Sequence, residues 1–392
     1  MYQSHHNLLL CEVINVKDHL MYTWQRPEWP SYSYIRDELS PEIQQYLKQL
    51  GELSGIYGCM STDDRAAVLV ESMVSNAMDT SEIEGENLDR RSVRSSIKQF
   101  LQLAPPATGR ASQKESGVAA MMVENRKTVF EPLSATYLHT LHELILNHER
   151  DNVLVKINLG QYRTSPEPMQ IVSGAVGYET VHYEAPPSSQ VPQEMEAFIT
   201  WFNDTAPKAG QGAKLSGVER AAIAHLWFET IHPYDDGNGR IGRAIADKAL
   251  SQDAGQAVLF NVASVLLKNR NEYYERLNDA SLTLDVQEWV SWFVGVTLKA
   301  QSIAKEGIDR VLEKTRYWDK YSQLPINDRQ QKAINKMFAL NPRDFGMTTK
   351  KYVSITKCSK ATASRDLAQL QEWGCVEVEG QGRGTRYNLP SG

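Results

Sequence analysis

The side chains best suited to chemistry in this chain lie together over residues 231–243, in the sequence IHPYDDGNGRIGR. Within this run His232 is the one group whose ordinary pKa lies near neutrality, which makes it the candidate general base. Asp236 stands just before a glycine-rich turn and can hold Mg²⁺, which is commonly bound by one carboxylate together with phosphate oxygens. The combination predicts a site that binds a magnesium-nucleotide and activates a hydroxyl group against one of its phosphates.

The Gly237-Asn238-Gly239 turn supplies groups that can bind those phosphates. Glycine and asparagine tolerate a positive φ, so successive N–H groups can point into an anion-binding nest. A predicted helix opens at the same place, and its free N–H groups face the same anion. Arg240 and Arg243 are three residues apart, hence neighbours on the first turn, and can clamp adjacent phosphates.

A purely structural explanation exists for each residue taken alone. His232 and Pro233 can cap a helix, and a Gly-Asn-Gly sequence can simply turn the chain. Their coincidence with Asp236 and two arginines favours the chemical explanation, because packing a core does not require these groups together. The remaining histidines of the central region have no such neighbours in the sequence, and His225 is predicted to be a core residue. The others are His139, His142, His148 and His182.

The run resembles the signature of Fic-domain proteins, H-P-F-x-[D/E]-G-N-G-R-x-x-R. Every position matches except Tyr234, where the family usually has Phe. That aromatic packs beneath the loop, so we expect the added hydroxyl to be tolerated. Fic proteins are helical around this motif, and most transfer AMP from ATP to a Ser, Thr or Tyr hydroxyl of a target protein. The resemblance implies His232 as the base, Asp236 as the Mg²⁺ ligand, Gly237, Asn238 and Gly239 as ligands of the α- and β-phosphates, and Arg240 and Arg243 as ligands of the outer phosphates.

Two further segments resemble parts of the same family. Residues 160–163 (GQYR), followed by Ile171-Val172-Ser173-Gly174, are similar to the family's flap, which docks the target segment by strand addition. Tyr273 and Tyr274 open a YYxxLxxA sequence that resembles the segment lining the adenine pocket, where an aromatic ring can stack on the base. Tyrosines on a helix are often core residues, so that alternative stays open for both.

Residues 80–85 (TSEIEG) fit the inhibitory pattern [S/T]-x-x-x-E-[G/N] of Fic proteins that carry their own inhibitor. The resemblance implies Glu84 as the inhibitory residue, with Thr80 and Gly85 at the other fixed positions. A carboxylate paired with Arg243 would occupy the cation meant for the γ-phosphate and repel the nucleotide. ATP could then bind only in an unproductive pose, so the chain is expected to inhibit itself.

Helices must position these residues, and apolar spacing predicts them along most of the chain. Residues 160–187 interrupt the pattern with alternating β-formers, glycine and proline, as in a short irregular hairpin. The aromatic and proline-rich residues 22–34 are expected to dock on a neighbouring surface. The predicted helices before residue 320 cover 40–57, 63–79, 88–101, 115–123, 134–148, 193–203, 216–230, 239–251, 268–280 and 286–312.

The C-terminal residues predict a separate module. Helices over 328–340, 348–355 and 361–373 precede two β segments within 374–389, which is the element order of a winged helix-turn-helix. Residues 327–392 carry 11 Lys and Arg against 6 Asp and Glu, whereas the rest of the chain is acidic. An anionic partner is one explanation of this asymmetry, and an ordinary solvated surface is the other.

The basic residues of the module are placed for phosphate contacts. Lys357, Lys360 and Arg365 lie near the predicted recognition helix, and Arg383 and Arg386 lie near the wing. The helix itself has few side chains suited to reading bases, and winged helices also dock on proteins. Both DNA and protein therefore stay open as partners of residues 325–392.

These features predict a mainly α chain that contains a Fic helical core with a β-hairpin flap and a C-terminal winged helix-turn-helix domain. A chain of 392 residues is long enough for two or three domains. Residues 1–110 are expected to form an N-terminal helical region with the inhibitory motif 80–85. The Fic core, with motif 232–243, is expected over 111–315, and the winged-helix domain over 325–392.

Composition is that of a soluble globular protein, 41% apolar and 23% charged. No apolar run approaches the roughly 18 residues of a membrane span, and the N-terminus lacks the basic region of a secretory signal. The cysteines show neither close pairing nor metal-ligand spacing, which predicts reduced thiols, no membrane partner and a cytoplasmic location. The sequence leaves open whether the chain forms a homodimer. The cysteines are Cys11, Cys59, Cys358 and Cys375.

Three functions follow from these patterns. The first is a protein adenylyltransferase, self-inhibited by Glu84, with ATP and a target protein as partners and Mg²⁺ as cofactor. The second is removal of AMP from modified proteins, with Glu84 orienting a water against the AMP–protein bond. The third is a DNA-binding regulator acting through the winged helix. A kinase is disfavoured because the sequence has neither a Walker motif nor a kinase loop.

Overall fold

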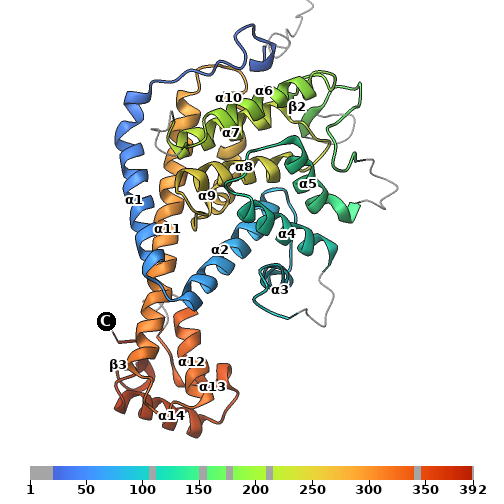
Figure 1. Cartoon of the computed structure of the whole chain (residues 1–392). Coiled ribbons are helices and arrows are strands. Elements are labelled where there is room, and N and C mark those ends of the chain that lie inside the picture. Colours follow the sequence, from blue (N-terminus) through green and yellow to red (C-terminus); the bar gives the residue numbers. More distant parts are fainter. Residues whose placement is uncertain are drawn as a thin grey trace, which may run out of the picture. The chain divides into compact units, whose positions relative to one another are not determined.

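The computed structural model describes residues 21–105, 112–149, 157–173, 180–208, 215–339 and 346–390. The chain divides into two compact units, Met1–Ala304 and Lys305–Gly392. The described residues are mainly helical and include two antiparallel two-stranded sheets (Figure 1). This confirms the mainly α fold class, while the division into three regions stays a prediction.

The aromatic and proline-rich residues 22–34 dock on neighbouring parts of the first unit, as predicted. Trp24 donates its indole N–H to the carbonyl of Glu184 at 2.8 Å, and the ring of Trp29 lies edge-on to Trp227 at 5.9 Å between centroids. The Trp29 indole therefore packs against the ring of Trp227 and donates its N–H to Glu194 Oε2 at 2.8 Å, so both indoles satisfy their single donor. Two 3₁₀ turns in this part cover Thr23–Gln25 and Arg36–Leu39, and the helices that follow are α1 (Ser40–Cys59), α2 (Thr62–Ile83) and α3 (Arg90–Phe100).

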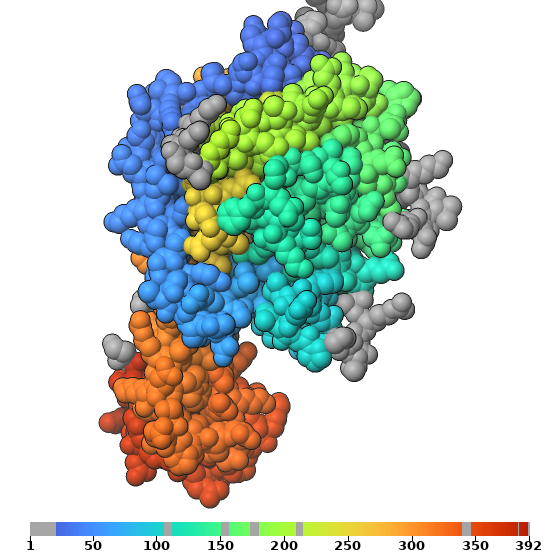
Figure 2. All heavy atoms as spheres, viewed as in Figure 1, coloured from blue at the N-terminus to red at the C-terminus, as the bar shows by residue number. Residues whose placement is uncertain are grey.

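Helix α7 (Gly217–Ile231) and helix α8 (Asn238–Asp253) pack side by side in the middle of the first unit (Figure 1). Nearly every residue of α7 is buried, which suits a helix with no polar face. Its start is defined by a capping box, in which Ser216 and Glu219 each accept the other's backbone N–H. On the face in Figure 2, the segment containing α8 shows only as a narrow yellow area between the blue N-terminal helices and the green α4–α5 segment.

The other helices of this unit agree with the predicted ranges to within a few residues, with two corrections. The predicted 268–280 helix is preceded by a separate short helix, α9, because Asn269 leaves helical geometry (φ −122°, ψ 39°) between α9 and α10. The predicted 286–312 helix continues to Lys320. The helices are α4 (Gln113–Lys127), α5 (Ala135–Leu146), α6 (Val191–Asp204), α9 (Val262–Lys268), α10 (Arg270–Ala280) and α11 (Gln287–Lys320), with a 3₁₀ turn at Asn147–Glu149.

The predicted irregular hairpin is present. Strand β1 (Gln170–Ser173) pairs antiparallel with β2 (Thr180–Glu184), and the register shifts between Ile171 and Val172. The buried Tyr183 donates its hydroxyl to the carbonyl of Thr230 at 2.6 Å, which fastens the hairpin to the last turn of α7. Gly174, which was assigned to the flap, lies outside the described residues.

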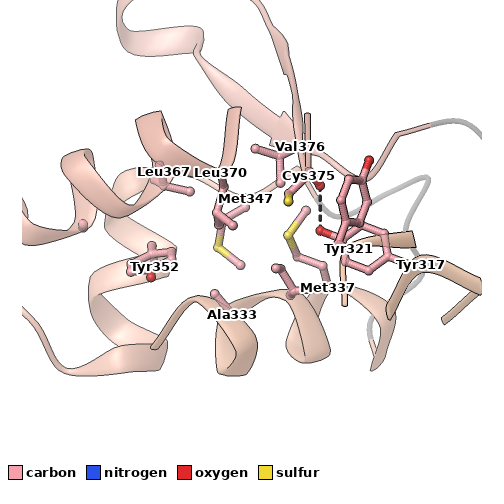
Figure 3. Packing of buried hydrophobic residues seen from close by; sticks show 12 residues of the cluster. Tyr317, Tyr321, Ala333, Met337, Met347, Tyr352, Leu367, Leu370, Cys375 and Val376 are labelled. Atoms are coloured by element: carbon pink, nitrogen blue, oxygen red, sulfur yellow. Dashed lines mark hydrogen bonds between the residues drawn. The ribbon is translucent and has the colours of Figure 1, made fainter. Parts of the chain in front are cut away.

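The second unit has its own apolar core. It contains α12 (Asp328–Ala339), α13 (Thr349–Thr356), α14 (Lys360–Glu372), a 3₁₀ turn at Gly382–Gly384 and the paired strands β3 (Glu377–Glu379) and β4 (Arg386–Asn388). In Figure 3, Met337, Met347 and Cys375 gather in this core, and the hydroxyl of Tyr317 donates to the carbonyl of Cys375 at 2.8 Å. Helix, helix, helix, hairpin is the element order expected from the sequence.

The described ranges contain no helix that is both long enough and apolar enough to cross a membrane. Cys59, Cys358 and Cys375 are free thiols, while Cys11 falls outside those ranges.

Candidate active site

His232 occupies the residue directly after the last turn of α7, in the left-handed region at φ 48° and ψ 60°. Its N–H still donates to the carbonyl of Phe228, so the residue closes the helix while its side chain turns away from the helix axis. A residue before proline normally prefers extended backbone, and a non-glycine residue in this region is strained by roughly 1–3 kcal/mol. The surrounding structure must therefore hold His232 in place.

Arg163 is the group that holds it. Its buried guanidinium donates from Nε to the carbonyl of His232 at 2.8 Å and from Nη2 to the carbonyls of Pro186 and Ile231 at 2.5 and 3.3 Å. Its backbone N–H also donates to the carbonyl of Pro233 at 2.9 Å. From the sequence, Arg163 was expected only in the flap, because no local pattern links positions 163 and 232.

Replacing Arg163 with alanine should destabilise the first unit. The change leaves three buried carbonyl groups without their donor, and we expect the free energy of unfolding to fall by about 3 kcal/mol, measured by urea denaturation. Arg163→Lys should recover only part of the loss, because an ammonium cannot reproduce the planar fork. Arg94→Ala, which removes a surface ion pair with Glu71, is the matched control and should cost less than about 1 kcal/mol. Equal losses for the two alanine variants would contradict the assigned role.

The loop after His232 is braced from inside. The amide of Asn238 accepts the N–H of Tyr234 at 2.9 Å and donates to the carbonyl of Tyr234 at 2.8 Å. The side chain of Asn238 is thus committed to the loop, and its backbone remains the part that can face an anion. Tyr234 is fully buried beneath the loop, as expected.

Two histidines that the sequence analysis set aside lie against this loop. The hydroxyl of Tyr234 is 3.0 Å from Nδ1 of His139, and the ring of His142 stacks on Tyr234 with centroids 4.2 Å apart. The hydroxyl at the position where the family usually has Phe therefore has a partner. His225 is fully buried and bonds the hydroxyl of Tyr273 at 2.8 Å, which confirms it as a core residue.

Helix α8 opens with Gly237 as its N-cap, at φ 83°. The free N–H groups of the first turn and the helix dipole make this end attractive to anions. The Asp236 carboxylate accepts the N–H of Gly237 at 2.5 Å, and its side chain is 57% exposed beside the helix start. The arrangement is the one predicted for binding phosphates with a carboxylate at their edge.

The carboxylate of Glu84 lies on this helix start. A Cβ atom at Gly239 would come within 2.3 Å of Glu84 Oε1, so the glycine is required for this close approach. Arg243 donates to Glu84 Oε1 at 2.7 Å, and also to the hydroxyl and the carbonyl of Thr80 at 2.7 and 2.9 Å. The predicted ion pair between Glu84 and Arg243 is therefore present.

The pair is electrostatically strong. Burial raises the pKa of Glu84, but the Arg243 guanidinium outweighs that effect and the pKa ends below its usual value. Burial likewise disfavours the charge on Arg243, yet the Glu84 carboxylate raises the pKa of Arg243 above its usual value. Both groups are therefore ionised in the folded protein.

Gly85 shows why the inhibitory pattern requires glycine or asparagine after the glutamate. It has φ 79° and directly follows Glu84, the C-cap of α2. The N–H of Gly85 donates to the carbonyl of Glu82 at 2.9 Å and that of Glu86 to the carbonyl of Ser81 at 2.9 Å, which together form a Schellman motif. Glycine or asparagine is needed after the glutamate because both adopt the left-handed conformation that ends the helix.

The base candidate is neutral. Burial, followed by the positive charge of Arg163, lowers the pKa of His232 to about 4. Burial also raises the pKa of Glu229 to about 8, and its Oε2 lies 3.8 Å from Nδ1 of His232. At neutral pH the imidazole can therefore accept a proton without first losing one.

The structure separates two tyrosines that the sequence analysis took together. Tyr273 is 1% exposed and its hydroxyl bonds His225, so its ring packs in the core and is not available to a base, which corrects its assignment to the adenine pocket. Tyr274 is 41% exposed, and its ring faces the guanidinium of Arg270 at 5.7 Å. Of the two tyrosines, Tyr274 is therefore the one whose ring could stack on an adenine base.

Two family models match parts of this chain. Residues 132–250 match the model of the Fic/DOC family, and residues 22–103 match a domain of unknown function (DUF4172). A crystal structure of a Fic family protein from Desulfovibrio desulfuricans has a TM-score of 0.53, 19% identity, and coverage of 93% of this chain and 98% of that one. At this identity the likeness shows the fold alone.

Two curated relatives match in short segments. A probable protein adenylyltransferase of Aquifex aeolicus is 31% identical over 98 residues, 25% of this chain and 26% of that protein. A uridine 5′-monophosphate transferase of Xanthomonas campestris pv. campestris is 34% identical over 67 residues, 17% of this chain and 12% of that protein. The match thus spans about a quarter or less of these relatives' length. The family-model match thus identifies residues 132–250 of this chain as a domain of the Fic/DOC family.

Proposed function

We propose that this chain is a protein adenylyltransferase, which transfers AMP from ATP to a Ser, Thr or Tyr hydroxyl of a target protein. The observation that carries the proposal is a neutral His232 held at the end of α7, immediately before the anion-binding start of α8. The relative from Aquifex aeolicus, named a probable protein adenylyltransferase, supports the choice of AMP. The relative named a uridine 5′-monophosphate transferase makes UMP the competing group.

In the proposed reaction His232 accepts the proton of the target hydroxyl through Nε2. The hydroxyl oxygen forms a bond to the α-phosphorus of ATP, and the bond from that phosphorus to the bridging oxygen of pyrophosphate breaks. Backbone N–H groups at the start of α8, together with Arg240 and Arg243, offset the charge of the phosphates. As in phosphoryl transfer generally, positioning and charge neutralisation supply most of the rate.

The residues near the start of α8 fit a magnesium ion. No group of three or more potential protein ligands for a metal occurs in the described part of the chain, so a site built from protein alone is not available there. Asp236 is a half-exposed carboxylate next to the proposed phosphate site, and Mg²⁺ is commonly held by one carboxylate plus phosphate oxygens. When bound, the ion would neutralise phosphate charge, and Asp236 would hold it.

The β1–β2 hairpin is proposed to dock the target segment. Ile171 is 41% and Val172 47% exposed, and β1 pairs only with β2 among the described strands. Its outer edge therefore offers main-chain groups to an added strand, a mode that is tolerant of the partner's sequence.

Self-inhibition by Glu84 completes the proposal. The carboxylate lies on the anion site and holds Arg243, which leaves a nucleotide to compete with a preformed ion pair. The same carboxylate could instead orient a water for removal of AMP, the second function considered above. Net transfer is favoured here because Arg243 and Glu84 neutralise each other, so Glu84 is not free to act as a base for water.

The direct test uses the Glu84→Gly variant, ATP labelled at the α- or γ-phosphate, and a bacterial lysate as the source of targets. Label from the α-position should reach protein, and label from the γ-position should not. His232→Asn is the negative control, and α-labelled UTP tests the competing group. Transfer from UTP with none from ATP would replace AMP by UMP in the proposal, and γ-label on protein would indicate a kinase.

The pH profile of transfer should show activity well into the acid range. Only the neutral imidazole can accept a proton, and because the pKa of His232 is lowered to about 4, it stays neutral down to that region. The acid limb of kcat/KM, corrected for protonation of ATP, should therefore lie clearly below the ordinary histidine pKa of about 6.5. An acid limb at or above that value would mean that the environment of His232 in the active protein is more polar than described.

Residues 325–392 are proposed as a second binding module, with DNA as the partner to test first. Lys360 and Arg365 are exposed on α14, and Lys357 and Arg386 are exposed elsewhere in the same unit. Such side chains suit phosphate contacts. Gel-shift binding that weakens steeply with added salt would support DNA, and salt-independent binding to a protein would replace it.

A further inference from the structure

A second carboxylate of the inhibitory segment binds a second motif arginine. Glu86 Oε2 accepts from Nη1 of Arg240 at 2.9 Å, and the other carboxylate oxygen lies 3.4 Å from Nζ of Lys114. The Arg240 side chain is 2% exposed and that of Glu86 18% exposed, so water screens this pair little. The six-residue pattern ends at Gly85 and does not include this residue.

The Schellman turn explains how both glutamates reach α8. Gly85 reverses the chain direction at positive φ, and the N–H of Glu86 is fixed on the carbonyl of Ser81. The side chains on either side of the glycine then extend to Arg243 and Arg240, which are three residues apart and hence neighbours on one face of α8 near its start. The backbone turn that presents the first carboxylate thus presents the second.

Arg240 has little else to bind. Its Nε has no hydrogen-bond partner within the described residues. Asp236 lies 3.8 Å from its Nη2, and the charge of Glu84 also acts on it from nearby. A nucleotide phosphate that approached the start of α8 would therefore meet two occupied arginines. Removing Glu84 would free Arg243 but leave Arg240 bound.

We propose that Glu86 is a second inhibitory residue, which must leave Arg240 before the phosphates of ATP can bind there. The proposal rests on the proposed function only in taking the start of α8 as the ATP site. Glu84 governs the outermost phosphate and hence the pose of the nucleotide, whereas Glu86 governs its affinity. Full release of the site then requires movement of the whole turn after α2, and not of one side chain.

The experiment measures ATP affinity by calorimetry and AMP transfer to protein separately. The variants are Glu86→Gln, Glu84→Gly and the double variant, with Glu82→Gln as the control, an exposed residue on the last turn of α2 that carries the same change of charge. Glu86→Gln should tighten ATP binding by about tenfold, the effect typical of a lost charge-assisted contact. Glu84→Gly should change transfer more than affinity, and the double variant should exceed both.

The two proposals fail in different ways. If AMP is transferred but the Kd for ATP of Glu86→Gln lies within twofold of that of Glu82→Gln, Glu86 is not an inhibitory residue and the proposed function stands. If no variant transfers AMP yet Glu86→Gln still tightens ATP binding, the inhibitory role of Glu86 stands and the proposed function is wrong. Glu86→Asp keeps the charge but shortens the side chain, so it should tighten binding less than Glu86→Gln. Its ATP affinity also tests the proposal if the glutamine variant unfolds.

Discussion

Replacing His232 with asparagine should reduce AMP transfer by about 10²–10⁴-fold, because it removes the proposed general base. Asparagine is the better replacement than alanine because the residue sits at φ 48°, and asparagine tolerates that conformation. The fold should survive, since Nδ1 of His232 has no hydrogen-bond partner within the described residues and asparagine keeps a polar side chain there.

The measurement is transfer from α-labelled ATP, with the variant made in the Glu84→Gly background so that inhibition does not mask the loss. ATP affinity and the thermal midpoint should change little, because His232 contacts neither the start of α8 nor Arg243 by a hydrogen bond in the described structure. His232→Ala should match His232→Asn in activity but unfold earlier. Retention of more than about a tenth of activity in either variant would reject His232 as the base.

Replacing Glu84 with glycine should raise transfer at least about tenfold above wild type, including modification of the chain itself. The gain follows from freeing Arg243, which is already held near the start of α8 by Thr80 and needs only phosphate in place of a carboxylate. Charge-assisted contacts of this kind are worth about 1.5–3 kcal/mol each, which sets the scale of the increase.

The gain should disappear when Arg243→Ala is added, because the freed cation is then absent. Glu82→Gly is the matched control, since it places glycine in the same exposed turn and leaves the ion pair intact. A Glu84→Gly protein no more active than wild type toward any target would refute self-inhibition. It would then favour the hydrolytic role for this carboxylate, which release of AMP from a premodified target would test.

Contiguous patterns in the sequence were enough to predict the helical fold and the helix–loop–helix around residues 232–243. The pairing of Glu84 with Arg243 was predicted from the resemblance to Fic proteins, since the two residues are 159 positions apart. The apolar spacing that predicts a helix depends only on nearby residues. The motif likewise places the base, the anion-binding nest and both arginines within twelve consecutive residues, 232–243. Their mutual geometry is therefore set by backbone conformation that the residues themselves specify, such as positive φ at Gly237 and Gly85.

Tertiary packing decided what no local pattern encodes. Arg163 reaches the strained His232 from 69 positions away, and Glu86 reaches Arg240 from 154 positions away. Of two adjacent tyrosines, Tyr273 is buried in the core and Tyr274 is exposed at the surface. Successive residues of a helix point about 100° apart, and whether each side chain is buried depends on which elements pack against that face. Spacing places a side chain on its own element, but its partner and its protonation depend on the elements that pack around it.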